Sequence, residues 1–206
     1  MDRESLYHFE PEPLLIVISG PSGVGKDSLV ARMEERGCPF YFVVTATDRA
    51  PRPEEVDGTD YFFVSTEEFE QMREEDELLE SAVVYGQYKG VPKQQVRDAM
   101  ASGKDVVMRL DVQGAATIRD IVPGAVLIFL VASSEAELVQ RLRDRGGDSM
   151  EQVERRVATA RQEMKRLPAF DYRVTNRDGE LDSAVDDVLA IIRAEHCRVE
   201  QREVHL

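Results

Sequence analysis

The order of hydrophobic and polar residues along this chain predicts strands and helices in alternation. Residues 14–18 are an unbroken apolar run, which is typical of a strand buried on both faces of a sheet. Apolar residues then recur with helical spacing at Leu29, Val30 and Met33, and this helix is expected to end at Gly37. A strand and a helix therefore follow one another directly near the start of the chain.

The pattern changes between residues 46 and 92, after a further strand predicted at 40–45. This stretch holds three of the nine prolines and predicts no long helix. It predicts short strands at 61–64 and 78–84, and a short helix that begins at a capping box in 65–68. We therefore expect residues 46–92 to leave the core and to bind a substrate.

Alternation returns at residue 93 and continues almost to the end of the chain. Strands are predicted at 105–110, 125–131 and 172–175, with helices between them. A final helix carries an apolar stripe that begins at Leu181 and reaches Ile192. This alternation predicts an α/β fold, with a three-layer α/β/α core in which helices cover both faces of a parallel sheet.

Composition narrows the classes of function. A chain of 206 residues suits one core with an inserted subdomain. Its net charge of −14 argues against a surface for nucleic acid or an anionic membrane, and no apolar run is long enough to span a bilayer. The two cysteines, Cys38 and Cys197, fit no metal-binding spacing and indicate a reducing compartment. Residues 1–13 form a segment that is too short and too acidic for a signal peptide. We expect a soluble cytoplasmic protein.

A glycine-rich segment joins the first strand to the first helix. Residues 20–26 read Gly-Pro-Ser-Gly-Val-Gly-Lys, which is a phosphate-binding loop in its expected place between strand and helix. Backbone N–H groups of such a loop and the helix N-terminus bind phosphate, and Lys26 adds a positive charge. The motif has Ser or Thr after the lysine to bind Mg²⁺, but this chain has Asp27, followed by Ser28.

A second group of residues suited to phosphate lies within residues 46–92. Arg49 and Arg52 are stiffened by Pro51 and Pro53, and the planar guanidinium group binds phosphate oxygens in pairs. Tyr61 adds a hydroxyl group. An arginine pair in a polar loop is more often solvated surface, but its place beside a triphosphate site favours phosphate binding.

The order of four motifs resembles guanylate kinases. They are the loop at 20–26, Arg49-x-x-Arg52-Pro53, Asp-Tyr-Phe-Phe-Val at 60–64 and Leu-Asp-Val-Gln-Gly at 110–114. The resemblance covers about residues 14–195. In detail, the chain is similar to the branch of the family that includes plant organellar enzymes. It implies a P-loop kinase that transfers the γ-phosphoryl group of ATP directly to GMP, and to dGMP, with Mg²⁺.

The same resemblance implies how the chain is divided. Residues 1–206 would form a single domain with a parallel-sheet core, a small mixed GMP-binding subdomain and a helical lid. The corresponding ranges are 14–45, 93–144 and 165–198 for the core, 46–92 for the GMP-binding region and 145–164 for the lid. A monomer or homodimer is expected, in the cytoplasm, or in a plastid or mitochondrion if a presequence has been removed.

Site residues follow by position from the resemblance. Those for ATP would be Gly20, Pro21, Ser22, Gly23, Val24, Gly25, Lys26, Asp27, Ser28 and Asn176. Those for GMP would be Thr45, Arg49, Arg52, Tyr61, Glu80, Lys89 and Asp111, of which Glu80 and Asp111 would face the guanine. Those that act in phosphoryl transfer would be Lys26, Arg49, Arg141, Arg145 and Arg156.

Two of these carboxylates have a physical rationale of their own. Glu80 could accept hydrogen bonds from guanine N1–H and the 2-amino group together, although one acid among 40 is more often solvated. Asp111 ends an apolar strand, where it suits a ligand-binding group and a helix cap equally.

The chain departs from the usual guanylate kinase pattern at four positions. Asp27 replaces the hydroxyl residue of the loop, and its carboxylate is a candidate ligand for Mg²⁺. Lys89 stands where many members have a tyrosine that contacts phosphate, and Val91 where a Ser or Thr contacts guanine. Arg109 stands at the first Asp of the usual Asp-x-Asp.

Two other functions fit part of the sequence. Gly-Lys-Asp-Ser-Leu also occurs in ribose bisphosphate kinases, but the segment from Arg49 to Val64 argues against that substrate. Guanylate-kinase-like scaffold domains keep the fold without catalysis, but they typically lose the phosphate loop, which is intact here.

Overall fold

A five-stranded sheet forms the centre of the computed structural model, which describes residues 11–53, 55–84, 86–144 and 150–206. The strand order is β2-β7-β1-β8-β9, and every neighbouring pair is parallel. The strands are β1 Leu15–Ser19, β2 Tyr41–Phe42, β7 Val106–Arg109, β8 Val126–Ala132 and β9 Tyr172–Asn176. The predicted parallel sheet is therefore confirmed, with the first strand at its middle.

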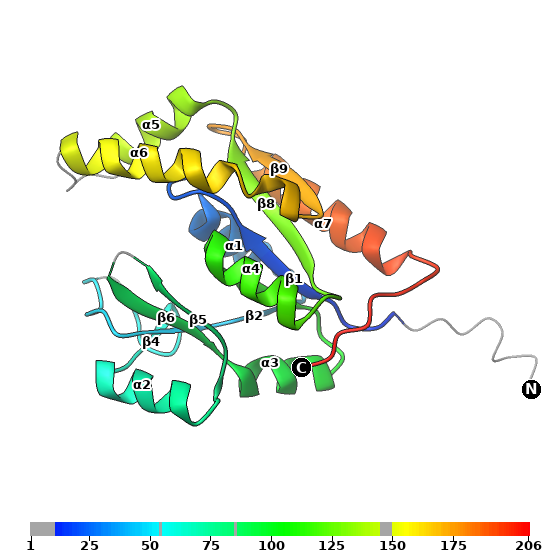
Figure 1. Ribbon diagram of the computed structural model, residues 1–206. Coiled ribbons are helices and arrows are strands. Elements are labelled where there is room, and N and C mark those ends of the chain that lie inside the picture. The colour runs from blue at the N-terminus through cyan, green and yellow to red at the C-terminus, as the bar shows by residue number, and fades with distance from the viewer. Residues whose placement is uncertain (1–10, 54, 85, 145–149) are drawn as a thin grey trace, which may run out of the picture.

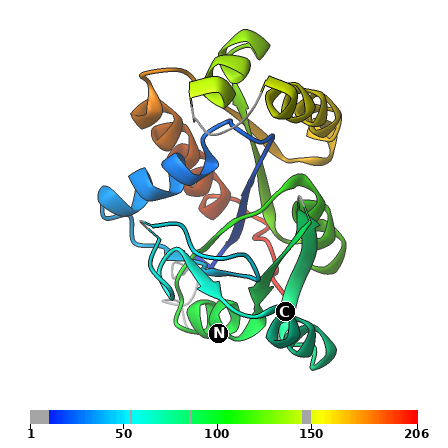
Figure 2. The same ribbon diagram turned by 90° about the vertical axis from the view of Figure 1, so that its left-hand side faces the viewer.

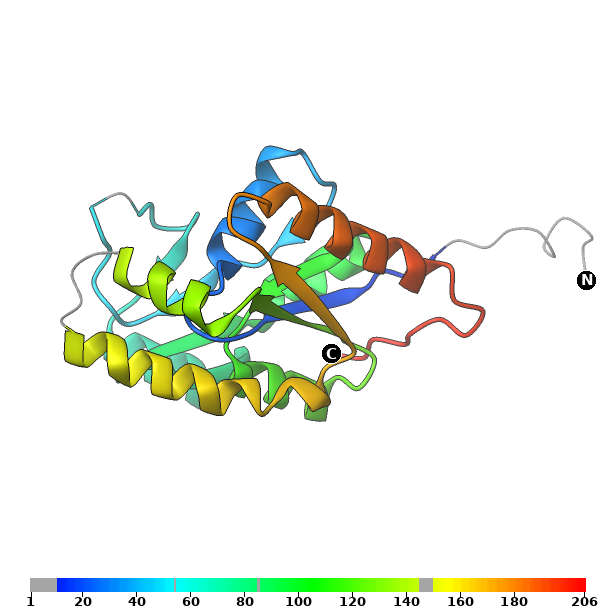
Figure 3. The ribbon, with the colours of Figure 1, turned by 90° about the horizontal axis from the view of Figure 1, so that it is seen from above.

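Helices cover both faces of this sheet. The helices α1 (Lys26–Glu35) and α7 (Leu181–His196) pack on one face, and α3 (Lys93–Ala101) and α4 (Val112–Ile121) pack on the other (Figures 2 and 3). Successive side chains of β1 alternate between the two: Ile16 and Ile18 join the core beneath α1 and α7, while Leu15 and Val17 join the core beneath α3 and α4. Because both faces are buried, β1 has to be apolar throughout.

A second, four-stranded sheet lies beside the core (Figure 1). Its order is β4-β3-β6-β5, and it is mixed, since β3 runs parallel to β4 but antiparallel to β6. The strands are β3 Thr45–Thr47, β4 Tyr61–Phe63, β5 Leu78–Val84 and β6 Gln87–Pro92. The helix α2 (Thr66–Glu74) begins at the predicted capping box of Ser65 and Glu68, and packs against this sheet through Phe69.

The strand predicted at 40–45 is wrong as a single element. Its first half is β2 of the central sheet, and its end belongs to β3 of the second sheet. Val43 makes the last bond to the central sheet, from its N–H to the carbonyl of Val107 at 3.0 Å. Both backbone polar groups of Val44 then bond to the side-chain amide of Gln95, at 3.0 and 2.7 Å. One apolar run therefore serves two sheets.

The strand β6 was not predicted. Its sequence, Gln-Tyr-Lys-Gly-Val-Pro, contains glycine and proline, and only Gly90 and Val91 are buried. It lies between β3 and β5, so that backbone hydrogen bonds to two neighbours replace the missing apolar alternation.

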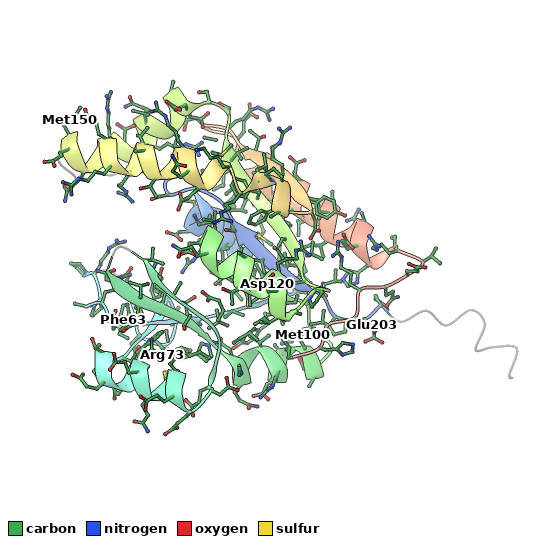
Figure 4. The ribbon with its side chains drawn as sticks, viewed as in Figure 1. Phe63, Arg73, Met100, Asp120, Met150 and Glu203 are labelled. Carbon is green, nitrogen blue, oxygen red and sulfur yellow. The ribbon has the colours of Figure 1, made fainter. Side chains whose placement is uncertain are left out.

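Two further helices stand on the opposite side of the core from the second sheet (Figure 1). They are α5 (Glu135–Asp144) and α6 (Met150–Met164), and a short 3₁₀ turn, η2 (Leu167–Ala169), leads from α6 to β9. Met150 at the start of α6 and Phe63 in β4 lie at the same end of the molecule (Figure 4). The lid predicted at 145–164 begins outside the described residues, and its range remains a prediction. In the described ranges no helix is long and apolar enough to cross a membrane.

A buried carboxylate fastens the C-terminal segment to the core. Glu195 of α7 accepts hydrogen bonds from Nε and Nη2 of Arg202, at 2.8 and 2.9 Å, and from the hydroxyl of Tyr172 at 2.6 Å. The guanidinium of Arg202 holds the pKa of Glu195 below its usual value. Arg198 is more distant, with its Nε 3.6 Å from the same carboxylate.

We expect Arg202→Met to lower the free energy of unfolding by about 3 kcal/mol at neutral pH, because it leaves a buried carboxylate without its main cation. The folded-state pKa of Glu195 is lower than the unfolded value of about 4.3, so this pair stabilises the fold above that pH and loses its contribution as the pH falls. In urea unfolding, the difference between variant and wild type should therefore shrink toward pH ~3.

The control is Arg198→Met, because that side chain is about half exposed and lies farther from the carboxylate. It should cost less than about 1 kcal/mol. Equal losses in the two variants would contradict the assignment.

Candidate functional site

Residues of other elements pack closely against two glycines of the loop between β1 and α1. Gly20 and Gly25 have φ values of 141° and 91°, a region that residues with a Cβ rarely adopt. A Cβ on Gly20 would lie 2.2 Å from the carbonyl oxygen of Leu130, and one on Gly25 would lie 2.5 Å from Nδ2 of Asn176. These two positions therefore require glycine both for backbone conformation and for space.

The side chain of Lys26 bonds to the backbone of the same loop. Its Nζ donates to the carbonyl oxygens of Gly20 at 2.6 Å and Pro21 at 3.0 Å. Burial lowers the pKa of Lys26, while the carboxylates of Asp27 and Glu163 raise it.

Three predicted residues from distant elements hold the loop. Asn176, at the end of β9, donates from Nδ2 to the carbonyl oxygen of Val24 at 2.9 Å. Arg141 of α5 donates to the same oxygen at 3.2 Å and to the carbonyl oxygen of Asn176 at 3.0 Å, and it pairs with Glu137. Arg156 of α6 donates to Oγ of Ser22 at 3.0 Å. Arg145, also predicted here, lies outside the described residues.

Glu163 is a residue that the sequence did not point to. It lies in the last turn of α6, and its Oε2 accepts a hydrogen bond from the backbone N–H of Ser22 at 3.2 Å. Burial raises the pKa of this carboxyl group. Nothing in the local sequence distinguishes Glu163 from the other acidic residues of this helix, because its contact is with Ser22, 141 positions away.

The second sheet supplies a cluster of cations around one phenol ring. Thr45 and Tyr61 are paired neighbours on β3 and β4. The guanidinium of Arg49 lies 4.8 Å from the centre of the Tyr61 ring, and Nζ of Lys89 lies 5.5 Å from it. Arg49 is bound at both terminal nitrogens by Glu55, at 2.6 and 2.5 Å, and this lowers the pKa of Glu55 to about 2. Glu55 was not predicted.

Arg109 joins the same cluster from the core. It is the last residue of β7, its Nη1 lies 3.2 Å from Oδ1 of Asp27, and its guanidinium lies 5.3 Å from the centre of the Tyr61 ring. Asp27, predicted as a metal ligand, is therefore paired with an arginine.

The two predicted guanine-binding carboxylates come from different parts of the fold, Glu80 from β5 of the second sheet and Asp111 from the segment that joins β7 to α4. Glu80 on β5 is 5% exposed and lies against the start of α4, where a Cβ on Gly114 would come 2.5 Å from its Oε1. Burial, with a smaller contribution from Asp111, raises the pKa of Glu80 to about 8. Asp111 caps α4, since its Oδ1 accepts from the N–H groups of Gln113 and Gly114 at 2.9 and 2.8 Å. Capping leaves Oδ2 of Asp111 available to a ligand.

One cavity of about 590 Å³ connects these groups. It is lined by Ser22, Gly23, Gly25, Lys26, Asp27, Ser28, Thr45, Arg49, Arg52, Tyr61, Lys89, Asp111, Arg141, Arg156 and Asn176 among the predicted residues. Gly20, Pro21, Val24 and Glu80 are not in its wall. The additional residues include Arg109, Glu163 and Arg177, and basic side chains outnumber acidic ones by eight to four. In a chain of net charge −14, this local excess favours a polyanionic ligand.

A family model described as guanylate kinase matches residues 12–195. The chain belongs to the guanylate kinase family. A rice (Oryza sativa subsp. japonica) protein named guanylate kinase 2, chloroplastic/mitochondrial, is 55% identical over 197 residues, which cover 95% of this chain and 69% of the relative. A guanylate kinase of Halalkalibacterium halodurans is 45% identical over 188 residues, 91% of each chain.

A solved guanylate kinase structure has the same architecture. The enzyme of Anaplasma phagocytophilum superposes with a TM-score of 0.78 at 27% identity, covering 93% of this chain and 90% of that one. The family and the fold class predicted from sequence are therefore confirmed. The roles of individual guanylate kinase site residues in this chain remain predictions.

We expect Gly25→Ala to weaken ADP binding by more than about tenfold. The added methyl group would displace Asn176 and the loop backbone, and this should cost more than the binding free energy of about 1.4 kcal/mol that a tenfold change represents. Gly37→Ala is the matched control, since Gly37 also has a positive φ of 65° but no atom within 4 Å of an added Cβ. It should lower stability by about 1–2 kcal/mol and leave ADP affinity unchanged. Calorimetric titration of both variants checks this, and equal affinities would contradict it.

Proposed function

We propose that this cavity is where a guanylate kinase transfers the γ-phosphoryl group of ATP to GMP, yielding ADP and GDP. The observation that carries the proposal is that a single basic cavity is walled by the phosphate loop on one side and by the Arg49, Tyr61 and Lys89 cluster on the other. Two separate anion-binding groups facing one space suit a donor and an acceptor phosphate.

The phosphate of GMP is assigned to Thr45, Arg49, Arg52, Tyr61 and Lys89. Glu55 supports this role by fixing the guanidinium of Arg49 over the Tyr61 ring. Within the described ranges, Lys89 has no carboxylate at ion-pair distance, so its charge is available to an anion. Arg52 lines the same cavity, is exposed, and has its Nη1 3.9 Å from Oε1 of Glu55, a separation that would let it turn toward a phosphate.

Recognition of guanine is assigned to Glu80 and Asp111. In the described part of the chain no donor bonds to the Glu80 carboxyl, although it is almost fully buried. Guanine N1–H and the 2-amino group would supply two donors to the ionised carboxylate, whereas adenine would present a lone pair. Val91 is paired with Glu80 across the sheet and is fully buried in the core, which supports selection by Glu80 rather than by a contact to Val91.

The phosphates of ATP are assigned to the loop from Gly20 to Ser28 and to Lys26, with Asn176 near the adenine. The backbone N–H groups of the loop and the N-terminus of α1 provide hydrogen bonds and a favourable dipole. Arg141 and Arg156 already contact the loop, which supports their proposed action on the transferred phosphoryl group. Arg145 keeps the same proposed role.

Catalysis would consist of positioning and charge neutralisation, because phosphoryl transfer demands little covalent chemistry from the protein. The loop and Lys26 hold the donor phosphates, while Arg49, Tyr61 and Lys89 aim an oxygen of the acceptor phosphate at the γ-phosphorus. The arginines of α5 and α6 neutralise the charge that is shared between the two phosphates and help to exclude water.

Magnesium is the metal that this reaction would use. Mg²⁺ is commonly held by one or two carboxylates together with substrate phosphates. Among the described residues no cluster of three or more His, Cys, Asp or Glu could hold a metal without help, which suits a cation bound mainly by the nucleotide. Asp27 lines the cavity next to Lys26 and fits the role of the protein ligand. The metal would supply positive charge at the β- and γ-phosphates.

The compartment and the assembly belong to the proposal as well. We propose the cytoplasm, with a plastid or mitochondrion as the alternative that the name of the rice relative suggests. Gel filtration would distinguish the expected monomer or homodimer.

The activity is tested by following ADP production with ATP, Mg²⁺ and one acceptor at a time. GMP should be the preferred acceptor, dGMP a slower one, and AMP and ribose bisphosphate poor ones. Equal rates with GMP and AMP, or a preference for ribose bisphosphate, would overturn the proposed substrate. ADP binding without turnover of any acceptor would indicate a scaffold domain.

Glu80→Gln is expected to lower kcat/KM for GMP by about 10³-fold or more, because the amide presents a donor to guanine where an acceptor is needed. Its affinity for ADP should equal that of the wild type, because Glu80 lies on β5 against the start of α4 and makes no contact with the phosphate loop among the described residues. A variant that keeps the wild-type preference for GMP over AMP would show that base selection lies elsewhere.

Binding of GMP should release a proton near neutral pH. With a pKa of about 8, the Glu80 carboxyl is mostly protonated at pH ~7, and accepting two hydrogen bonds from guanine requires its ionised form. Affinity should therefore rise by up to about tenfold per pH unit below the pKa and level off above it. Calorimetry in two buffers of different ionisation enthalpy measures the proton, and Glu80→Gln separates it from protons of the nucleotide phosphate. Equal proton release by both proteins would contradict the prediction.

A further inference from the structure

The ion pair of Asp27 and Arg109 lies where the two proposed phosphate sites meet. Asp27 directly follows Lys26 in the first turn of α1, and Arg109 ends the neighbouring strand β7. The Arg109 side chain is 23% exposed, and both residues line the cavity. With its guanidinium 3.2 Å from Asp27 and 5.3 Å from the Tyr61 ring centre, Arg109 reaches toward both the donor and the acceptor side.

Arg109 adds a third cation to one aromatic ring. Arg49, Lys89 and Arg109 have their charged groups 4.8, 5.5 and 5.3 Å from the centre of Tyr61. Charges of the same sign gathered around one ring repel one another, so an anion that enters between them would stabilise the cluster. Glu55 neutralises Arg49 of the same loop, and Asp27 of α1 neutralises Arg109 of β7.

The two neutralising carboxylates differ in how firmly they are held. Glu55 binds Arg49 at two oxygens and also accepts from the backbone N–H of Arg52 at 2.8 Å. The contact of Asp27 to Arg109 joins one oxygen to one nitrogen, and the Asp27 side chain is 59% exposed. Because its side chain is more than half exposed, Asp27 has room to turn from Arg109 toward the cavity, and the N-terminus of α1 would still favour its negative charge.

An arriving polyphosphate acts on the two partners in opposite ways. Its negative charge next to Lys26 repels the Asp27 carboxylate and attracts the Arg109 guanidinium. Guanidinium binds phosphate oxygens well, whereas a carboxylate beside phosphate is stable mainly when a divalent cation lies between them. The pairing of the two residues also explains why both depart from the usual pattern, since Asp27 alone would oppose phosphate binding.

We propose that Arg109 is a phosphate-binding residue of the transfer step and that Asp27 is its exchangeable counter-ion. Entry of the nucleotides releases Asp27 toward the Mg²⁺ that accompanies them and frees Arg109 to bind the phosphoryl group between donor and acceptor. In that step the bond from the γ-phosphorus to the β,γ-bridging oxygen breaks, that oxygen stays with ADP, and a GMP phosphate oxygen bonds to the phosphorus. Arg109 contributes charge alone. The inference rests on the proposed function for the identity of the two nucleotides.

The test compares Arg109→Met, Asp27→Asn and the double variant with a control at a structural ion pair. Arg119→Met is the matched control, because Arg119 is 27% exposed, pairs with Asp171 at 2.7 Å and does not line the cavity. Calorimetry of ADP binding, with Mg²⁺ and with excess chelator, gives a readout that does not depend on turnover. Steady-state kinetics with ATP and GMP and thermal unfolding complete the comparison.

Arg109→Met should weaken metal-free ADP about tenfold, the factor expected for a lost charge-assisted hydrogen bond, and lower kcat by about 10²–10³-fold. Asp27→Asn should instead bind metal-free ADP about tenfold more tightly while gaining less from Mg²⁺ than the wild type. Arg109→Lys should recover part of the lost turnover because it keeps the charge. The control should lose thermal stability without any change in affinity or kcat.

Three results would overturn the proposal. The first is wild-type affinity and turnover in Arg109→Met, and the second is weaker metal-free ADP binding in Asp27→Asn. The third is a loss of turnover in Arg109→Met no larger than in the control at an equal loss of stability. If Arg109→Met does not fold, Arg109→Lys and Asp27→Asn still decide through ADP binding. If the wild type does not phosphorylate GMP, the proposed function fails, while the ADP titrations still test Arg109.

Discussion

Repulsion between phosphate groups is the constraint on which the arrangement of this protein depends. Two phosphorylated nucleotides have to meet in a chain whose own net charge is −14. The proposed site meets this demand with basic side chains, which outnumber acidic ones by eight to four among the described residues that line the cavity. Basic side chains around one cavity repel each other, and carboxylates partly neutralise three of them: Glu55 pairs with Arg49, Asp27 with Arg109 and Glu137 with Arg141.

The fold serves this constraint by bringing separate segments to one edge of a parallel sheet. Because the strands of the central sheet all point the same way, the phosphate loop after β1, Arg109 and Asp111 after β7, and Asn176 at the end of β9 share that edge. The second sheet and the pair α5 and α6 then add cations from opposite sides of the core (Figure 1). The acidic surface elsewhere has no part in the site.

The sequence predicted the elements whose signal is local. The apolar run of β1, the capping box of α2 and the bounds of β5 were correct because each depends on neighbouring residues. The strand at 40–45 was wrong because an apolar run does not show which of two sheets it joins. Glu163, Glu55 and the pairing of Arg109 with Asp27 were missed because they are recognised by ion pairs and hydrogen bonds, which leave no periodicity in the chain. The turn between β1 and α1 was predicted correctly because strand, glycines and helix are contiguous, while its binding of phosphate stays a prediction.

The close approach of Gly114 to Glu80 has a consequence for the evolution of base preference. Because an added methyl group at residue 114 would lie 2.5 Å from Oε1 of Glu80, the position of the carboxylate depends on a residue in another element. With the role proposed for Glu80, a single substitution at Gly114 would displace the carboxylate and weaken guanine selection while Glu80 itself stayed intact. Under that proposal, base preference in such an enzyme depends on residues 80 and 114 together rather than on Glu80 alone.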